Sequence, residues 1–333
     1  MPDTTFTIDK NEINSILPSR FVFLCSASFE KRSTTIPLSL DPSRISHSVV
    51  FRSRGYKNDT SLNEIKNKIA TSKVIDFDLN NPVSVARSLT EVVKECSSLE
   101  SAIVIDITTF THEILAMLLK LIHDNETKFS SIFCLYNGAA DYSNSKENGL
   151  TQMWLSKGCR DVRNVIGYPG RMRPTAKTSL IILTGFELER ATKLIEIIEP
   201  DRLMLGFGND PTHDNHLEPV AFFQEKFENW KKNYKNSNCT EFGFSCKNIE
   251  KTTEVLSDLT ADPDENYIVV PLNTKLSTIA SSIVALKNPM IQICYSIPEM
   301  YNMDDYSSPG EKITVVNLCE ILNLKKDLKG GSI

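Results

Sequence analysis

The two halves of this chain carry the same short signatures in the same order, and this repetition constrains the fold more than any other feature. Each half has an apolar run that leads into Phe-Glu, then a run that ends in a polar turn, then an apolar run that contains a cysteine. The paired positions lie 157, 165 and 160 residues apart: Glu30 and Glu187, Asp106 and Pro271, Cys134 and Cys294. This near-constant spacing predicts an internal duplication, because a repeated structural unit keeps its period apart from loop insertions.

Short apolar runs alternate with amphipathic stretches of helical period, which indicates βαβ units and a mainly parallel sheet. The first half predicts strands near 20–25, 48–52, 73–77, 101–106 and 130–136, and helices near 29–39, 61–70, 82–97 and 111–123. The second half predicts strands near 179–184, 202–206, 240–244, 266–271, 290–295 and 312–318, and helices near 186–198, 216–234, 248–259 and 274–287. The last of these strands closes a sheet edge or runs antiparallel.

We therefore predict an α/β fold built by internal duplication from two Rossmann-like doubly wound units with mainly parallel sheets. Repeat 1 covers residues 1–143 and repeat 2 covers residues 179–325. Residues 144–178 form a connector with a basic Gly-Pro loop, and residues 326–333 form a flexible tail.

The composition narrows the class of protein. The chain has 333 residues, 41% of them hydrophobic, which suits two domains of ordinary size. A net charge of −5 argues against broad DNA binding, which needs a strongly basic surface. The eight cysteines contain no C-x-x-C pair, and Cys25, Cys134 and Cys294 lie in apolar runs, so we expect them to be buried and reduced. Without a secretory signal or a long apolar span, we expect a cytoplasmic protein with no membrane contact.

The repeated Phe-Glu has two interpretations. Thr184 and Glu187 have the spacing of a capping box, in which each side chain caps the start of one helix. Glu30 lacks the matching threonine, so capping alone does not explain it. Both glutamates follow the carboxyl end of a predicted strand, where open α/β sheets bind ligands. Both readings stay open, and the basic residue Arg32 is a candidate ligand contact beside Glu30.

A basic stretch lies within the predicted connector. Residues 157–173 contain five basic residues and one acid in an otherwise acidic chain. A Gly-Pro loop of this charge suits a phosphate or another anion. The alternative is an exposed connector with solvated charges. The candidate ligand contacts here are Arg163, Tyr168, Gly170, Arg171 and Arg173. The chain contains no P-loop sequence.

A polar cluster follows the fourth predicted strand of the first half. Asp106 is a candidate general base or ribose ligand, and it is followed by Thr108, Thr109, His112 and Glu113. Thr109 is also a candidate helix cap. The second half has Pro271 in place of the aspartate and offers Asn273 and Lys275 instead. We therefore expect any chemistry to reside in one half, with the other half a degenerate copy.

Two further motifs favour structural interpretations. Gly206-Phe-Gly208 lacks the rest of a dinucleotide fingerprint and indicates a turn. Asp210, His213 and His216 carry metal-binding atoms, but their polar, proline-flanked segment favours a solvated loop. The sequence predicts no metal site and no cofactor.

The chain resembles a group of uncharacterised bacterial proteins with tandem Rossmann-like units. The resemblance rests on Trp154-Leu-Ser-Lys-Gly158, Arg163, Val165–Gly170, Gly185-Phe-Glu187 with Arg190, and Asp106–Leu115. The group brings no settled activity. More broadly, two fused Rossmann-like units are similar to the sensor modules of prokaryotic defence systems that bind cyclic or linear nucleotides between paired copies. This similarity implies a sensor or accessory subunit in defence against phage, with protein partners in a defence complex.

Two classes of function remain open, together with a scaffold role in a larger complex. In the binding hypothesis, the two repeats form one cleft for a nucleotide-like or other anionic small molecule. Its contacts come from the basic loop and from the strand ends: Arg32, Thr108, Thr109, Glu187, Asn273 and Lys275. In the enzyme hypothesis, Glu30 and Asp106 divide acid and base roles in the hydrolysis or transfer of a nucleotide or nucleoside bond.

Overall fold

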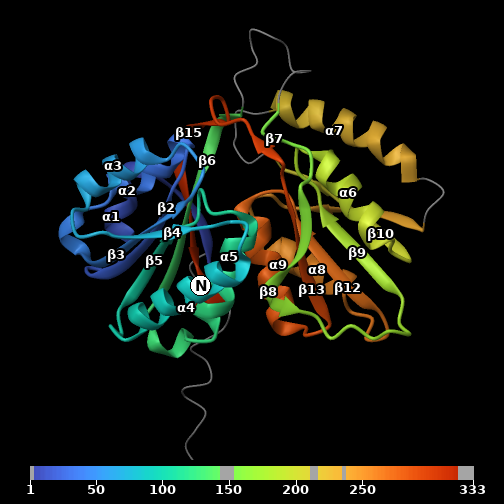
Figure 1. Cartoon of the computed structure of the whole chain (residues 1–333), viewed down its shortest axis with the longest axis horizontal. Helices are drawn as coiled ribbons and strands as arrows, with labels where there is room; N and C mark the ends of the chain where they lie inside the picture. Colours follow the sequence, from blue (N-terminus) through green and yellow to red (C-terminus); the bar gives the residue numbers. More distant parts are fainter. Residues whose placement is uncertain (1–3, 143–153, 211–216, 235–237, 322–333) are drawn as a thin grey trace, which may run out of the picture. The chain divides into compact units, whose positions relative to one another are not determined.

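The computed structural model describes residues 4–142, 154–210, 217–234 and 238–321 (Figure 1). The chain divides into two compact units. Unit 1 comprises residues 1–140 and 307–333, and unit 2 comprises residues 141–306. The segment from residue 307 onward thus belongs with the first unit, whereas the sequence assigned it to the second repeat.

Unit 1 contains a seven-stranded sheet of order β1-β15-β6-β5-β2-β3-β4. Its strands are β1 (Thr5–Asp9), β2 (Phe21–Ala27), β3 (Ile45–Ser53), β4 (Lys73–Phe77), β5 (Ala102–Asp106), β6 (Ile132–Tyr142) and β15 (Ser307–Asn317). Its α-helices are α1 (Ile13–Ile16), α2 (Thr35–Ser39), α3 (Asp59–Lys68), α4 (Pro82–Ser97), α5 (His112–His123) and α10 (Leu318–Ile321). Short 3₁₀ turns are η1 (Lys10–Glu12), η2 (Lys31–Thr34), η3 (Pro42–Arg44) and η4 (Glu126–Lys128). The pairs β6-β5, β5-β2, β2-β3 and β3-β4 are parallel, and β1 pairs antiparallel with β15.

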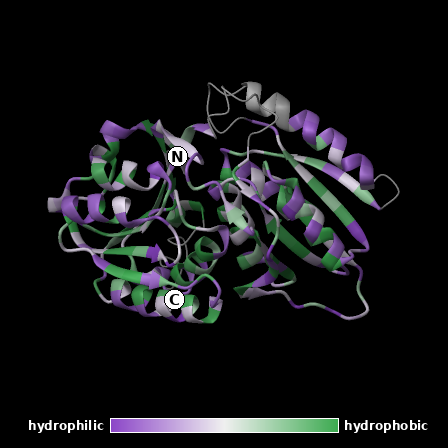
Figure 2. Cartoon of the chain, turned by 45° about the horizontal axis from the view of Figure 1, so that its top comes forward, coloured by the Kyte–Doolittle hydropathy of each residue, from purple (hydrophilic) through white to green (hydrophobic). Residues whose placement is uncertain are grey.

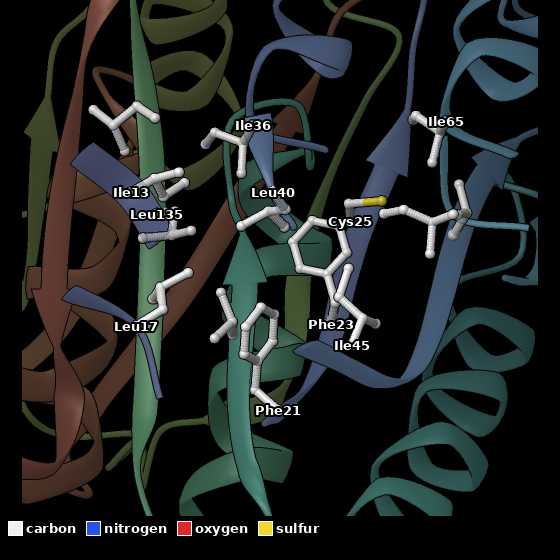
Figure 3. Packing of buried hydrophobic residues seen from close by; sticks show 14 of the residues in the cluster. Ile13, Leu17, Phe21, Phe23, Cys25, Ile36, Leu40, Ile45, Ile65 and Leu135 are labelled. Atoms are coloured by element: carbon white, nitrogen blue, oxygen red, sulfur yellow. The ribbon is translucent and has the colours of Figure 1, made fainter. Parts of the chain in front are cut away.

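The core of unit 1 explains why its central strands are almost continuously apolar. All seven residues of β2 are buried, because helices cover both faces of this parallel sheet. One face carries Phe21, Phe23 and Cys25, which pack with Ile36 and Leu40 of the α2 region (Figure 3). Helices α4 and α5 cover the opposite face (Figure 1).

Unit 2 contains a six-stranded sheet of order β11-β10-β9-β12-β13-β8 and a small pair, β14-β7. The strands are β7 (Ser156–Lys157), β8 (Asp161–Pro169), β9 (Thr178–Leu183), β10 (Arg202–Gly208), β11 (Cys239–Phe244), β12 (Asn266–Pro271), β13 (Ile291–Ile297) and β14 (Met300–Tyr301). The helices are α6 (Leu188–Ile198), α7 (Leu217–Lys231), η7 (Lys232–Tyr234), α8 (Ile249–Leu259) and α9 (Lys275–Lys287). Strand β8 runs antiparallel to β13, and the other five strands are parallel. Helices α6 and α7 contribute Leu188, Leu194 and Phe227 to the core on one face.

The predicted α/β class with mainly parallel sheets is confirmed. In each unit the first parallel strand lies in the middle, the next two lie on one side of it, and the last two lie on the other. The central strands are rich in hydrophobic residues, whereas most helices mix hydrophobic and hydrophilic residues (Figure 2). The predicted strands and helices lie close to the observed ones. This agreement is expected because burial in the core determines the spacing of apolar residues from which they were predicted.

The two units exchange one strand each with respect to chain order. The strand that joins each sheet beside its last parallel strand comes from the segment that follows the parallel strands of the other unit. Strand β8 follows β6 of unit 1 in the sequence but pairs with β13 of unit 2. Strand β15 follows β13 and β14 of unit 2 but lies beside β6 in unit 1. The predicted sixth strand near 312–318 is therefore real, although it belongs to unit 1.

Strand β8 lies where the sequence predicted a basic loop. Its register shifts between Gln292 and Cys294 of β13, and Gly167 has a φ of 101°. Only Val165 and Tyr168 of β8 are buried, so the alternation of a regular strand is broken. Because a bulged strand lacks the regular alternation of apolar and polar residues, its sequence resembles that of a loop.

Two expectations from the composition can be compared with the structure. Cys25, Cys134 and Cys294 are buried free thiols, as predicted. Burial raises the pKa of Cys294 to about 12 and that of Cys134 still further. In the described part of the chain, no helix has both the length and the apolar character needed to cross a bilayer.

Candidate functional site

The carboxyl ends of the parallel strands bring most of the predicted residues to one edge of each sheet. The strand order reverses direction between β2 and β5 in unit 1, and between β9 and β12 in unit 2. Ligands of open α/β sheets bind at such reversals, outside the carboxyl ends of the strands. The ends of these four strands and the segments that follow them contain Glu30, Asp106, Thr108, Thr109, Glu187, Asn273 and Lys275.

In unit 1, Glu30 forms a buried ion pair with Arg32 at the start of η2. Arg32 Nη2 lies 2.6 Å and Nε 3.0 Å from Glu30 Oε2. The Ser307 hydroxyl of β15 bridges the pair, because it accepts from Arg32 Nε at 2.9 Å and donates to Glu30 Oε2 at 3.0 Å. Arg32 Nη1 also donates to the carbonyl of Asn137 in β6 at 3.1 Å. Glu30 Oε2 thus accepts hydrogen bonds from both Arg32 and Ser307.

A chain of hydrogen bonds connects this pair to Asp106. The Asp106 carboxylate accepts from the Thr108 N–H at 3.0 Å, and Thr108 Oγ1 accepts from the Asn137 N–H at 3.1 Å. Asp106 is fully buried, and burial raises its pKa to about 7 despite the opposing hydrogen bonds from Thr108 and the charge of Arg32. The carboxyl group can therefore exchange a proton near neutral pH.

The threonine predicted as a cap has another role. Helix α5 is capped by Thr111, whose side chain accepts from the Ile114 N–H. Thr109 instead donates to the Ser26 carbonyl at 2.8 Å and so connects the ends of β5 and β2. The capping prediction for Thr109 is wrong because the helix begins two residues later.

In unit 2, Glu187 and Arg190 lie at the start of α6, directly after β9. Arg190 is buried, and its Nη2 donates to the Ser296 carbonyl of β13. Its guanidinium lies 5.4 Å from the ring centre of Tyr295. Burial opposes the charge of Arg190, but Tyr295 and Glu187 outweigh this and raise its pKa. Burial raises the pKa of Glu187, and Arg190 counteracts that effect.

The two Glu–Arg pairs differ in how many of their polar atoms have a hydrogen-bond or ion-pair partner. The shortest distance from Arg190 to Glu187, between Nη1 and Oε2, is 3.7 Å, whereas Arg32 contacts Glu30 at 2.6 Å. Arg190 Nε is buried and has no hydrogen-bond partner in the part of the chain that the structure describes. The same holds for Ser156 Oγ, although the Ser156 N–H donates to Glu187 Oε1 at 2.5 Å.

The loops after β9 and β12 are in close contact. A Cβ atom on Gly185 would lie 2.0 Å from the Leu272 carbonyl oxygen, so only glycine fits there. The Asn273 side-chain N–H donates to the Thr184 carbonyl at 2.7 Å, while Asn273 Oδ1 is buried without a partner among the described residues. Thr184 donates to the Gly206 carbonyl.

The capping box predicted for Thr184 and Glu187 is wrong. Glu187 occupies the cap position of α6 but makes no side-chain capping bond there. The carboxylate accepts from Ser156 instead, a residue 31 positions earlier in the chain. Because this partner is distant in sequence, local spacing could not indicate it.

Lysines from three elements lie along this edge of unit 2. Lys275 is the first residue of α9, which is capped by Thr274. Lys247 follows β11, and Lys226 Nζ lies 3.4 Å from the Phe186 carbonyl in the loop after β9. The partial positive charge of the α9 N-terminus adds to theirs.

The structure separates the arginines of the predicted basic loop. Arg163 of β8 lies opposite Tyr295, toward the carboxyl end of β13, whereas the Arg171 N–H donates to Pro289, before that strand begins. A seven-residue strand such as β13 spans about 20 Å. Arg173 contacts Asp264 at 3.4 Å, next to the amino end of β12.

The other two loop residues have structural positions. Tyr168 is buried, and Gly170 has a φ of 65° and would bring a Cβ within 2.9 Å of the Gln292 Cβ. These two residues therefore shape β8 and its end, and the arginines on either side of them stay apart.

The remaining polar cluster of unit 2 is structural. Asp210 accepts from the Ser245 hydroxyl and the Cys246 N–H, which fixes the turn after β11. Burial, with the nearby charge of Asp210, raises the pKa of Cys246 to about 12, so its thiol is protonated. His213 and His216 lie outside the described residues. Among those that are described, His, Cys, Asp and Glu form no group that could hold a metal ion.

The comparisons with known proteins identify no related family or curated protein. No protein-family model matches the chain, and no curated protein matches its sequence significantly.

Proposed function

We propose that this protein binds a nucleotide-like, phosphate-bearing small molecule at the carboxyl edge of the unit 2 sheet, in the cytoplasm. We further propose that the two units are Rossmann-like copies that arose by duplication. The shared strand order supports the duplication. So do the Glu–Arg pairs, since each arginine donates to a carbonyl of the fifth parallel strand, Asn137 in unit 1 and Ser296 in unit 2.

The observation that carries the binding proposal is Asn273 Oδ1 beside the start of α9, which is buried and has no hydrogen-bond partner among the described residues. A buried carbonyl oxygen without a donor costs about 1–3 kcal/mol. A ligand hydroxyl or amine would satisfy it. Lys275 and the first N–H groups of α9 suit a phosphate at the same place. A nucleotide offers both kinds of group in one molecule.

Unit 1 is the less suitable half for such a ligand. At its equivalent edge, the donors of Arg32 are used by Glu30, Ser307 and Asn137. The expectation that one half binds and the other is degenerate is therefore part of the proposal, with unit 2 as the binding half.

The test is calorimetry with mono-, di- and cyclic nucleotides on the wild type and two lysine variants. Lys275→Ala should weaken binding by about tenfold, because a hydrogen bond to a charged group contributes about 1.5–3 kcal/mol. Lys287→Ala is the matched control, since Lys287 ends the same helix about 18 Å away. Equal losses in both variants, or no binding of any nucleotide by the wild type, would contradict the proposal.

A second candidate is a hydrolase or transferase that uses Asp106 with Glu30. The raised pKa of Asp106 favours it, because a general base works best near the ambient pH. Against it, Glu30 is held in an ion pair with Arg32. Product analysis with the same nucleotides decides: turnover by the wild type that disappears in Asp106→Asn would favour the enzyme. On the resemblance described above, the proposal extends to a sensor or accessory subunit in defence against phage.

A further inference from the structure

We propose that Glu187, Arg190 and Ser156 form a recognition site for a sugar hydroxyl of the ligand, an inference that rests on the proposed function. The argument starts from unit 1, where a hydroxyl already bridges a Glu–Arg pair. Ser307 Oγ accepts from Arg32 Nε at 2.9 Å and donates to Glu30 Oε2 at 3.0 Å. The geometry of a bridged pair is therefore present in the same chain.

The pair in unit 2 has the same donors and acceptors, but none of the described residues bridges it with a hydroxyl. Arg190 is only 5% exposed, and its Nε has no partner among the described residues. Ser156 is 4% exposed, and its Oγ is likewise unpartnered there. Both lie beside the Glu187 carboxylate, through the 3.7 Å contact with Arg190 and the 2.5 Å hydrogen bond from the Ser156 N–H.

The chemistry of these groups selects a hydroxyl rather than a phosphate. Arg190 Nε can only donate, and an ionised Glu187 can only accept. A hydroxyl accepts from the first and donates to the second, as Ser307 does in unit 1. A phosphate would satisfy Arg190 but would lie against the Glu187 carboxylate, which repels it. The phosphate of one ligand would thus bind near Lys275, and its hydroxyl would bind near Glu187 and Arg190 on the same edge of the sheet.

The position of the pair suits this division. Glu187 follows β9, and Asn273 and Lys275 follow the neighbouring strand β12. Asn273 is hydrogen-bonded to Thr184, three residues before Glu187. The Glu187 side chain is 17% exposed, so part of it faces solvent at this edge.

The experiment compares AMP with 2′,3′-dideoxy-AMP by calorimetry. The wild type should bind AMP about tenfold or more tightly, because dideoxy-AMP lacks the hydroxyls that the charged pair would bind. Glu187→Gln and Ser156→Ala should bring this ratio close to one and leave the affinity for dideoxy-AMP unchanged or improved. Glu196→Gln, at an exposed position further along the same helix, should keep the wild-type ratio. A ratio near one in the wild type, or a ratio that survives in Glu187→Gln, would overturn the inference.

Two further probes separate this inference from the proposed function. Inorganic pyrophosphate tests the lysine edge alone, and ribose tests the hydroxyl site alone by amide chemical shifts in NMR. Ribose shifts at Ser156 that vanish in Glu187→Gln, without any binding of pyrophosphate or AMP, would retain the hydroxyl site and reject the nucleotide proposal. No response to ribose together with equal binding of the two nucleotides would reject the hydroxyl site alone.

Discussion

Replacing Asp106 by asparagine should stabilise unit 1 at alkaline pH and leave it nearly unchanged at acidic pH. The carboxyl group is fully buried, and burial raises its pKa from an ordinary 3.8 to about 7. Between these two values the folded state holds a proton that the unfolded state has lost. Stability therefore falls as the pH rises through this range and becomes level above about pH 7.

The size of the effect follows from the two pKa values. A difference of about three units corresponds to about 4 kcal/mol, of which about 3 kcal/mol lies between pH 5 and pH 8. Asparagine removes the charge and keeps an oxygen that can accept from the Thr108 N–H, so the hydrogen bond to the backbone survives. The free energy of unfolding of Asp106→Asn should accordingly exceed that of the wild type at pH 8 by up to about 4 kcal/mol.

The assay is urea unfolding of both proteins at pH 5, 6, 7 and 8. Asp76→Asn is a control of opposite sign, because the hydrogen bonds from Arg52 lower the pKa of Asp76 and stabilise its charged form. That variant should lose stability at neutral pH. If the pH profiles of Asp106→Asn and the wild type ran parallel, the carboxyl group would not titrate in this range and the argument from burial would fail.

Three other outcomes follow from the contacts described above. Glu30→Gln leaves the buried Arg32 charge without its partner and should cost about 3–5 kcal/mol in urea unfolding; a loss below 1 kcal/mol would argue against a structural pair. Gly185→Ala should sharply lower the melting temperature, since the new Cβ meets the Leu272 carbonyl at 2.0 Å; an unchanged value would show that the loop can shift. A thiol reagent should label the native protein slowly and the urea-unfolded protein fast at three buried cysteines: Cys25, Cys134 and Cys294.

The sequence predicted the parallel core well because that pattern is local. Strand β12 matches its predicted bounds, and α4 matches at both ends, where Asn81 caps the helix and Pro82 begins it. Such signals lie within a few residues of the structure they determine.

What the sequence missed depends on distant partners. Ser307 contacts Arg32 across 275 residues, and no local pattern marks that serine. From the sequence, the basic stretch has two interpretations, an anion-binding loop and an exposed connector; in the structure it contains β8, which pairs only with β13 within the described chain. Charged side chains, a bulge and a proline at the end are the features that protect an edge strand from pairing with other chains. The charge of Arg163 therefore also suits the exposed side of an edge strand.

The placement of β15 has a consequence for synthesis on the ribosome. The first 140 residues emerge with β6 in place, but the strand that lies between β6 and β1 is about 170 residues further along. At roughly 5–20 residues per second, this strand arrives about 10–35 s later. During that interval β1 and the outer edge of β6 lack the pairing they have in the finished sheet, and Glu30 and Arg32 lack the hydroxyl of Ser307. Unit 2 is complete once residue 306 has emerged, so the later part of the chain can fold first and the earlier part last.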